Sequence, residues 1–100
     1  MKTAVFPGSF DPITIGHLDI IMRALPIFDK IIIAIGVNTK KEYLFPLEQR
    51  KEWIRAIFRN EKKIEVMDYT GLTIDFVRKQ GAKYMLRGLR SGADFDYERT

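Results

Sequence analysis

The sequence contains no cysteine and a single histidine. The lack of cysteine excludes disulfides and thiolate metal sites, and it fits a reducing compartment. Long hydrophobic runs are also missing, because the longest one, at residues 31–35, is far too short to span a bilayer. No secretory signal peptide is visible, since Lys2 precedes only a short apolar stretch that breaks at Pro7 and Gly8. These absences predict a cytoplasmic protein.

The composition is that of a globular domain. Hydrophobic residues make up 46% of the 100 residues and charged residues 30%. This length corresponds to a single domain, expected over residues 1–100. Seventeen Lys and Arg residues against thirteen Asp and Glu residues give a net charge of +4, which suits an anionic ligand such as a nucleotide or nucleic acid. An ordinary basic protein is the alternative reading of the charge alone.

Apolar spacing predicts strands and helices in alternation. Strands are expected at 2–6, 30–37, 63–67 and 83–86, helices at 15–25, 47–58 and 72–79, and a helix that has only begun at 94–100. Gly81 is expected to cap the third helix. This order predicts an α/β fold, a Rossmann-like doubly wound parallel sheet with helices on both faces and right-handed crossovers.

Four segments follow the carboxyl ends of the predicted strands, where ligands of such sheets bind. They are residues 7–14, 38–45, 68–73 and 87–94. In the first segment, Gly8 allows a sharp turn, and Thr14 stands where a helix N-cap is expected. His17 then falls in the first helical turn, beside free N–H groups that favour a phosphate. The alternative is a buried histidine whose hydrogen bonds the backbone satisfies.

Several other chemistries find little support. Neither the Gly-x-Gly-x-x-Gly fingerprint nor a P-loop occurs in the sequence. A hydrolytic triad of Ser9, His17 and Asp11 is possible only on paper, because no Gly-x-Ser-x-Gly elbow surrounds the serine. One histidine without cysteine makes a zinc site weaker still.

Two later segments carry basic residues directly after strands. Lys40 and Lys41 can reach across the sheet end, or they form a solvated charge pair. Arg87 and Arg90 flank Gly88 and Leu89, and a guanidinium is suited to bidentate phosphate contacts. A solvated surface role is the alternative for these arginines also.

The stretches "GSFDPITIGH", "NTKK", "RGLR" and "ADFDYE" together resemble the bacterial phosphopantetheine adenylyltransferases, which belong to the nucleotidyltransferase superfamily with an x-x-Gly-His motif. The resemblance covers the whole chain and implies a dinucleotide-binding fold of the nucleotidyltransferase type. It also implies the family reaction, in which ATP adenylates 4′-phosphopantetheine to give dephospho-coenzyme A and pyrophosphate.

The resemblance assigns catalytic roles to His17, Lys41 and Arg87. His17 would donate to the α-phosphate of ATP, while Lys41 and Arg87 would hold the acceptor phosphate. The implied ATP-binding residues are Ser9, Phe10, His17, Gly88, Leu89, Arg90 and Glu98, and the implied acceptor-binding residues are Ser9, Lys41, Thr73 and Arg87. No metal site on the protein is expected, and Mg²⁺ would be carried mainly by the ATP phosphates.

Members of this family are longer and include a further strand, further helices and a Ser-rich "ISSS" motif that this sequence lacks. The chain is therefore expected to be the N-terminal portion of a longer domain whose C-terminal part is missing. The resemblance implies a homohexamer, with no nucleic acid or membrane partner. Two alternatives stay open: a sibling cytidylyltransferase or nicotinate-nucleotide adenylyltransferase, and an inactive fragment or binding module.

Overall fold

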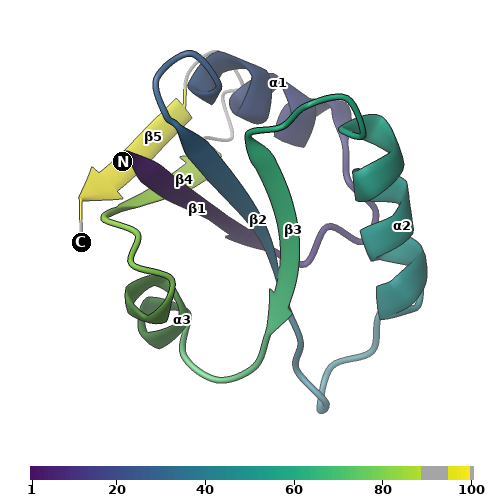
Figure 1. Cartoon of the computed structure of the whole chain (residues 1–100). Helices are drawn as coiled ribbons and strands as arrows, with labels where there is room; N and C mark the ends of the chain where they lie inside the picture. The colour runs from purple at the N-terminus through teal and green to yellow at the C-terminus, as the bar shows by residue number, and fades with distance from the viewer. Residues whose placement is uncertain (89–94, 100) are drawn as a thin grey trace.

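The computed structural model describes residues 1–88 and 95–99. Within them, strands and helices alternate as far as the fourth strand, and a fifth strand follows (Figure 1). The elements are β1 (Thr3–Gly8), α1 (Ile15–Ala24), β2 (Lys30–Gly36), α2 (Leu47–Ile57), β3 (Ile64–Tyr69), α3 (Thr73–Lys79), β4 (Tyr84–Gly88) and β5 (Phe95–Arg99). The predicted order of the first seven elements is confirmed.

The strands form one sheet in the order β3-β2-β1-β4-β5. The pairs β1–β2, β2–β3 and β1–β4 are parallel, as the alternation predicts. The chain moves outward from β1 to β3 and then returns to the other side of β1 for β4. In doubly wound sheets, ligands bind outside the carboxyl ends of the strands at this point of reversal. The topology therefore points to the carboxyl ends of β1 and β4.

Helices cover both faces of the sheet, which confirms the doubly wound prediction. One buried cluster joins side chains of the sheet with those of α1 and α2, including Ile21 and Ile54. A second cluster joins the opposite face with Phe76 and Val77 of α3. Because both faces of β2 are covered, residues 31–35 are all buried, which explains the continuous apolar run.

Local signals determine two helix ends. Thr14 is the N-cap of α1, as predicted. After α3, Gly81 has φ +71°, a backbone conformation that glycine adopts without steric cost. The Gly81 N–H donates to the Arg78 carbonyl, and the Ala82 N–H donates to the Val77 carbonyl. These two bonds form a Schellman motif, so the predicted role of Gly81 in ending the helix is confirmed.

The helix predicted at residues 94–100 is wrong. Residues Phe95–Arg99 form β5, which pairs antiparallel with β4 in the register Met85↔Glu98. Aromatic residues alternate with charged ones at positions 95–98, and this period of two favours a strand. The side of β4 away from β1 also offers unpaired backbone groups to β5.

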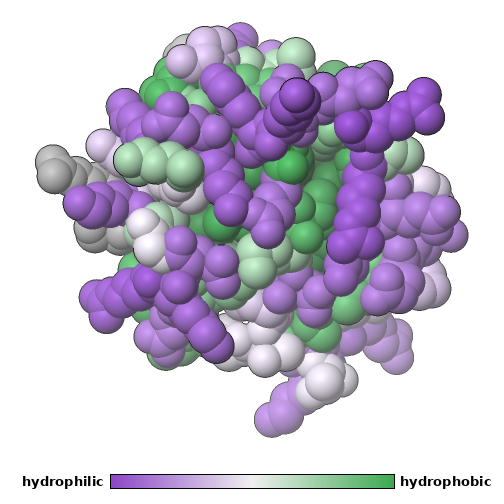
Figure 2. Space-filling view, in the orientation of Figure 1, coloured by the Kyte–Doolittle hydropathy of each residue, from purple (hydrophilic) through white to green (hydrophobic). Residues whose placement is uncertain are grey.

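None of the helices in residues 1–88 has the length and apolar character needed to cross a bilayer. Figure 2 shows hydrophilic residues over most of one face, with apolar residues visible between them. Some large apolar side chains are exposed, among them Met22 and Ile57.

Candidate active site

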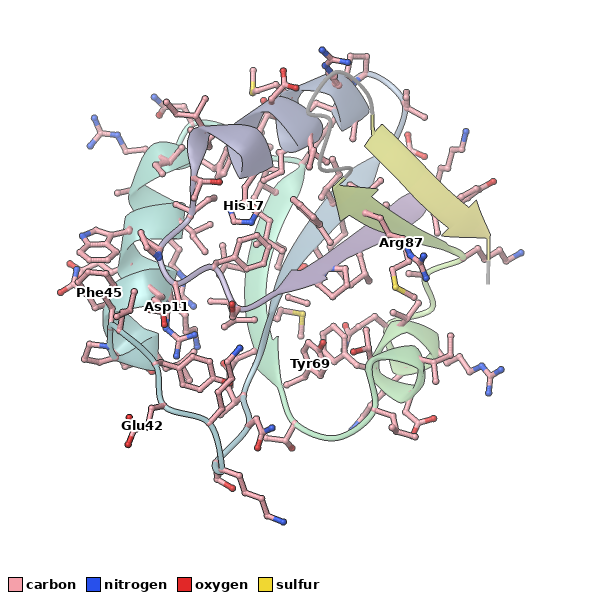
Figure 3. The ribbon with its side chains drawn as sticks, turned by 180° about the vertical axis from the view of Figure 1, so that it is seen from behind. Asp11, His17, Glu42, Phe45, Tyr69 and Arg87 are labelled. Carbon is pink, nitrogen blue, oxygen red and sulfur yellow. The ribbon has the colours of Figure 1, made fainter. Side chains whose placement is uncertain are left out.

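Most of the residues singled out in the sequence lie after the carboxyl ends of strands, but Arg87 and Gly88, expected in a loop, are the last two residues of β4. Figure 3 shows His17 and Arg87. Ser9 comes directly after β1, and His17 lies in the first turn of α1. Lys41 lies between β2 and α2, Thr73 is the first residue of α3, and Arg87 lies in β4. Because β1 stands between β2 and β4 in the sheet, these segments meet at one edge.

His17 is held by a reciprocal capping interaction. The Thr14 N–H donates to Nδ1 of His17 at 2.9 Å, and the His17 N–H is 3.4 Å from the Thr14 hydroxyl oxygen. An Nδ1 that accepts a hydrogen bond carries no proton, so in the neutral ring the proton is on Nε2. His17 therefore offers Nε2–H as a donor, with the ring orientation set by the cap.

Partial burial of the ring lowers the pKa of His17 below its usual value of about 6.5. The cause is desolvation, which disfavours the charged form. Protonation of Nδ1 would also remove the acceptor that the Thr14 N–H uses. In the free protein the ring is therefore mainly neutral at pH 7.

This lowered pKa predicts a pH effect on stability. Between the lowered folded pKa and the unfolded value of about 6.5, the unfolded chain binds the proton first. The contribution of His17 is therefore present above about pH 6.5 and is lost as pH falls through the folded pKa. We expect urea-unfolding midpoints of the full natural chain to fall more between pH 7 and 5.5 than those of His17→Gln, which does not titrate there. Equal pH dependence in both proteins would contradict the assignment.

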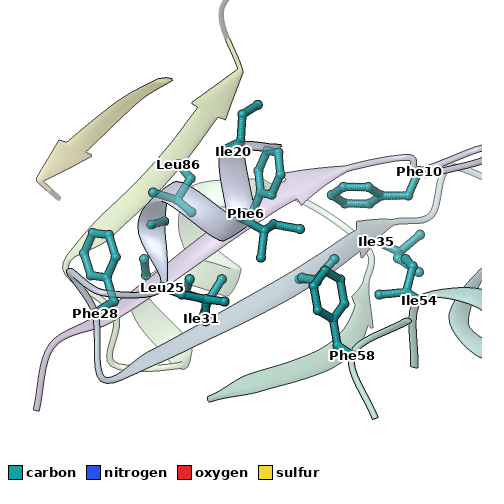
Figure 4. Packing of buried hydrophobic residues seen from close by; sticks show 14 residues of the cluster. Phe6, Phe10, Ile20, Leu25, Phe28, Ile31, Ile35, Ile54, Phe58 and Leu86 are labelled. Atoms are coloured by element: carbon teal, nitrogen blue, oxygen red, sulfur yellow. The ribbon is translucent and has the colours of Figure 1, made fainter. Parts of the chain in front are cut away.

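Phe10 has a left-handed backbone with φ +47°, although it is a bulky residue. Such a conformation costs on the order of 1–3 kcal/mol and is retained only where the surroundings impose it. The Phe10 ring is 1% exposed, with ring centroids 5.3 Å from Phe6 and 4.8 Å from His17. A Cβ on Gly8 would come within 3.1 Å of the Phe10 ring, so glycine leaves room for it. Figure 4 shows Phe10 at one end of the buried cluster.

The first loop is tied to the loop that carries Lys41. The Asp11 carboxylate accepts from the Leu44 N–H at 2.6 Å and from the Phe45 N–H at 2.8 Å. Figure 3 shows Asp11 beside Phe45. Both carboxylate oxygens are thus used by backbone amides, and Nδ1 of His17 is an acceptor. A hydrolytic triad needs the reverse, an Nδ1–H that donates to a carboxylate, so the Ser9–His17–Asp11 triad is excluded.

Lys41 is exposed in this second loop, and its ammonium lies 5.5 Å from the centroid of the Tyr43 ring. The Tyr43 hydroxyl donates to the Gly36 carbonyl at 3.3 Å and accepts from the Asn38 N–H at 2.9 Å. A groove of about 460 Å³ is bordered by this loop and includes Lys41 and Arg50 in its lining. The loop is thus closed on itself around Tyr43, with a cation at its surface.

Thr73 and Arg87 lie on the face of the sheet that α3 covers, opposite the face covered by α1 and α2. Thr73 shares a hydrogen bond of 2.8 Å with the Tyr69 hydroxyl, and the Tyr69 ring stacks on Phe76 of α3. Met85 packs against the buried cluster that contains Phe76 and Val77 of α3. Because side chains alternate between the two faces along a strand, Arg87 lies on the same face of the sheet as Met85. The structure therefore places Ser9, Phe10 and His17 near one another at the end of β1. Thr73 and Arg87 lie at the same edge of the sheet but on its opposite face.

The remaining predicted residues are only partly described. Gly88 ends β4, and the backbone of Glu98 pairs with Met85. Leu89 and Arg90 lie outside the described residues. Within the described part of the chain, no three His, Cys, Asp or Glu side chains are grouped so that they could hold a metal ion.

Sequence reasoning missed Arg50, and it considered Asp11 only as a member of a possible triad. Arg50 occupies the apolar face of α2 together with Leu47 and Ile54, at spacings of three and four residues. An arginine in such a position was the signal that could have found it. No comparable signal marks Asp11, because its partners lie 33 and 34 residues away.

Comparison with known proteins shows what this chain is similar to. The model of a family described as cytidylyltransferase-like matches residues 5–100. Among the curated relatives, phosphopantetheine adenylyltransferase from Flavobacterium johnsoniae is 58% identical over all 100 residues, and that from Flavobacterium psychrophilum is 57% identical. The chain spans 66% of the length of these two relatives.

A more distant relative with the same name, from Geotalea daltonii, is 53% identical over 98 residues, which are 61% of its length. Among solved structures, a bifunctional NMN adenylyltransferase/ADP ribose pyrophosphatase from Francisella tularensis, complexed with AMP and a manganese ion, matches with a TM-score of 0.59 and 28% identity. That match covers 82% of this chain and 25% of the other.

Proposed function

The chain belongs to the cytidylyltransferase-like family, and from this premise we propose that it transfers the adenylyl group of ATP to 4′-phosphopantetheine, giving dephospho-coenzyme A and pyrophosphate. The observation that carries this proposal is His17, whose Nδ1 is occupied by the Thr14 N–H and whose Nε2–H is left as a donor. The relatives named phosphopantetheine adenylyltransferase, two of which are 58% and 57% identical, support the choice of acceptor.

In the proposed reaction, an oxygen of the acceptor phosphate attacks the α-phosphorus of ATP in line. The new bond joins that oxygen to the α-phosphorus, and the bond from the α-phosphorus to the bridging oxygen breaks. Pyrophosphate leaves with the electron pair. Such a transfer needs positioning and charge stabilisation rather than a covalent nucleophile on the protein. The absence of a triad at His17 agrees with this requirement.

We assign the acceptor phosphate to Ser9, Lys41 and Arg87, and the α-phosphate to His17. Neutral His17 can donate through Nε2 without competing with the cap, because the Thr14 N–H uses only Nδ1. A phosphate beside the ring would raise its pKa again, so the imidazolium would be favoured as charge develops. Thr73 is assigned to the pantetheine arm of the acceptor.

We assign the binding of ATP to the first loop and to the segment after β4. The set is Ser9, Phe10, His17, Gly88, Leu89, Arg90 and Glu98. Phe10 supports this assignment through its ring, which packs against His17 and fixes the loop beside it.

Mg²⁺ fits this site when it is carried by the phosphate oxygens of ATP, where it neutralises negative charge. The described residues include no cluster of metal-binding side chains, so the ligands we propose are the phosphates. The crystallised relative with AMP and manganese supports the use of a divalent cation.

We also propose a cytoplasmic protein, residues 1–100 as part of one nucleotidyltransferase domain, and a homohexamer. The lack of cysteine agrees with a reducing compartment. Exposed apolar side chains such as Met22 and Ile57 provide surface that an assembly could cover.

A substrate comparison tests this function. We expect the full natural chain to release pyrophosphate from ATP with 4′-phosphopantetheine at a kcat/KM at least about 10²-fold above that with nicotinate mononucleotide, because a site built for one acceptor leaves polar groups unpaired with another. CTP with glycerol phosphate is the third arm. A preference for either alternative acceptor would assign the chain to a sibling reaction, and no turnover in any arm would favour a binding role.

A further inference from the structure

Arg50 is the only buried charged residue among those the structure describes, with 2% of its surface exposed. Its Nε donates to the Phe45 carbonyl at 2.9 Å, and its Nη1 donates to the Ser9 carbonyl at 2.9 Å. The guanidinium also lies 4.3 Å from the centroid of the Tyr43 ring. The guanidinium thus contacts two backbone carbonyls and one aromatic ring, each in a loop at the carboxyl edge of the sheet.

Asp11 and Arg50 are linked to each other by hydrogen bonds through Phe45 and through the backbone of the first loop. The peptide groups of Phe45 are held from both sides, since the N–H donates to Asp11 and the carbonyl accepts from Arg50. Arg50 then returns to Ser9, two residues before Asp11. The two loops are therefore joined at Ser9 and Asp11 on one side and at Phe45 on the other.

We propose that Arg50 and Asp11 act as positioning residues, which hold the loop of Lys41 against the loop of Ser9 so that their phosphate-binding groups keep one fixed spacing. This inference rests on the proposed adenylyl transfer. We call the hydrogen-bonded set of Ser9, Asp11, Phe45 and Arg50 the loop clamp.

The loop clamp is connected to the three residues near the ends of β1 and β2 that we assign to phosphate binding, namely Ser9, Lys41 and His17. Ser9 is a member of it. Lys41 is connected through Tyr43, whose ring contacts both the Lys41 ammonium and the Arg50 guanidinium. His17 is connected through Phe10, which lies between the two clamped residues of the first loop and packs on the His17 ring. The strained backbone of Phe10 is thus held on both sides.

Alternative roles for a buried arginine fit the contacts less well. A structural ion pair would use a carboxylate, but the two hydrogen bonds of Arg50 end on carbonyls of the two loops. A buried charge without an opposite charge carries a desolvation cost, which the hydrogen bonds of Arg50 to the two loops offset only in part. From α2, Arg50 hydrogen-bonds to Phe45 in one loop and to Ser9, 41 residues earlier, in the other.

In the full natural chain, the test uses Arg50→Met, which keeps an unbranched stem of about the length of the aliphatic part of arginine and removes the guanidinium with its N–H donors. We expect kcat/KM for phosphopantetheine to fall by about 10²-fold, because a displacement of roughly 1 Å in a reacting group has an effect of that size. Lowered kcat should accompany a raised KM for the acceptor. Arg50→Lys should recover part of the loss, and Arg55→Met, exposed on the same helix, should leave both constants unchanged.

A second readout does not depend on activity. Amide hydrogen exchange at Leu44 and Phe45, measured without substrate, should become faster in Arg50→Met and in Asp11→Asn. If the unmodified protein does not transfer adenylyl groups, the proposed function fails, while this exchange still reports on the loop clamp. Where Arg50→Met does not fold, Arg50→Lys and Asp11→Asn carry both measurements.

Slower turnover together with faster exchange at Leu44 and Phe45 supports the role in positioning. Unchanged kinetic constants in a folded variant overturn it, whatever the exchange shows. Slower turnover with unchanged exchange overturns it also, since the loss would then arise away from the loop clamp.

Discussion

Replacement of His17 by alanine is expected to lower kcat for adenylyl transfer by about 10²–10³-fold, the loss typical of removing one preorganised donor to a developing charge. The physical reason is the Nε2–H of His17, which the cap leaves available because the Thr14 N–H occupies Nδ1. No neighbouring side chain in the first turn of α1 can replace it, since Ile15 and Gly16 carry no donor beyond the backbone.

The matched control is His17→Gln, whose side-chain amide presents an N–H at a similar reach. Steady-state pyrophosphate release by the full natural chain is the measurement, and circular dichroism confirms that each variant is folded. We expect His17→Gln to retain more activity than His17→Ala. Unchanged turnover in His17→Ala would remove His17 from the reaction and leave it a capping residue only.

Replacement of Phe10 by alanine is expected to lower the free energy of unfolding by about 3–5 kcal/mol, the range for removing a fully buried aromatic ring. The Phe10 ring is 1% exposed and contacts the rings of Phe6 and His17. Most domains are stable by only about 5–15 kcal/mol, so the loss is a large share of the total. Urea unfolding of the full natural chain measures it.

A comparison of glycine with alanine at this position isolates the backbone conformation. Glycine in regular structure is less stable than alanine by roughly 0.5–1 kcal/mol, but a left-handed conformation costs a residue with a Cβ roughly 1–2 kcal/mol. At φ +47°, Phe10→Gly should therefore be at least as stable as Phe10→Ala. The control is Phe6, in strand β1, where the alanine variant should be the more stable of the pair. The same order at both positions would contradict the left-handed backbone.

The two predictions above concern His17 and Phe10, which the sequence already identified as site residues. The physical reasons for the expected effects, however, come mostly from the structure. The glycine and N-cap signals led to His17 without showing that its Nδ1 accepts a bond and that its free form is neutral. Phe10 was named through resemblance alone, and its left-handed backbone has no signal in the residues around it.

The predicted helix at residues 94–100 shows a different limit. The alternation of aromatic and charged residues at 95–98 favours a strand, but it is only four residues long, which is too short to establish a period by itself. The open edge of β4 favours the strand, and that edge exists only once the sheet has formed. The pairing partner therefore stabilised a strand that the short local pattern only suggested.

By itself, the sequence determined the order of the elements, the doubly wound class, the cap at Thr14 and the loops that hold the candidate site. These depend on periodicity and on interactions within a few residues, as in the three-residue span from Thr14 to His17. Tertiary structure alone decided the loop clamp, because Arg50 meets Ser9 across 41 residues and Asp11 meets Phe45 across 34. Contacts of that range form only when packing brings distant segments together, and no local pattern encodes them.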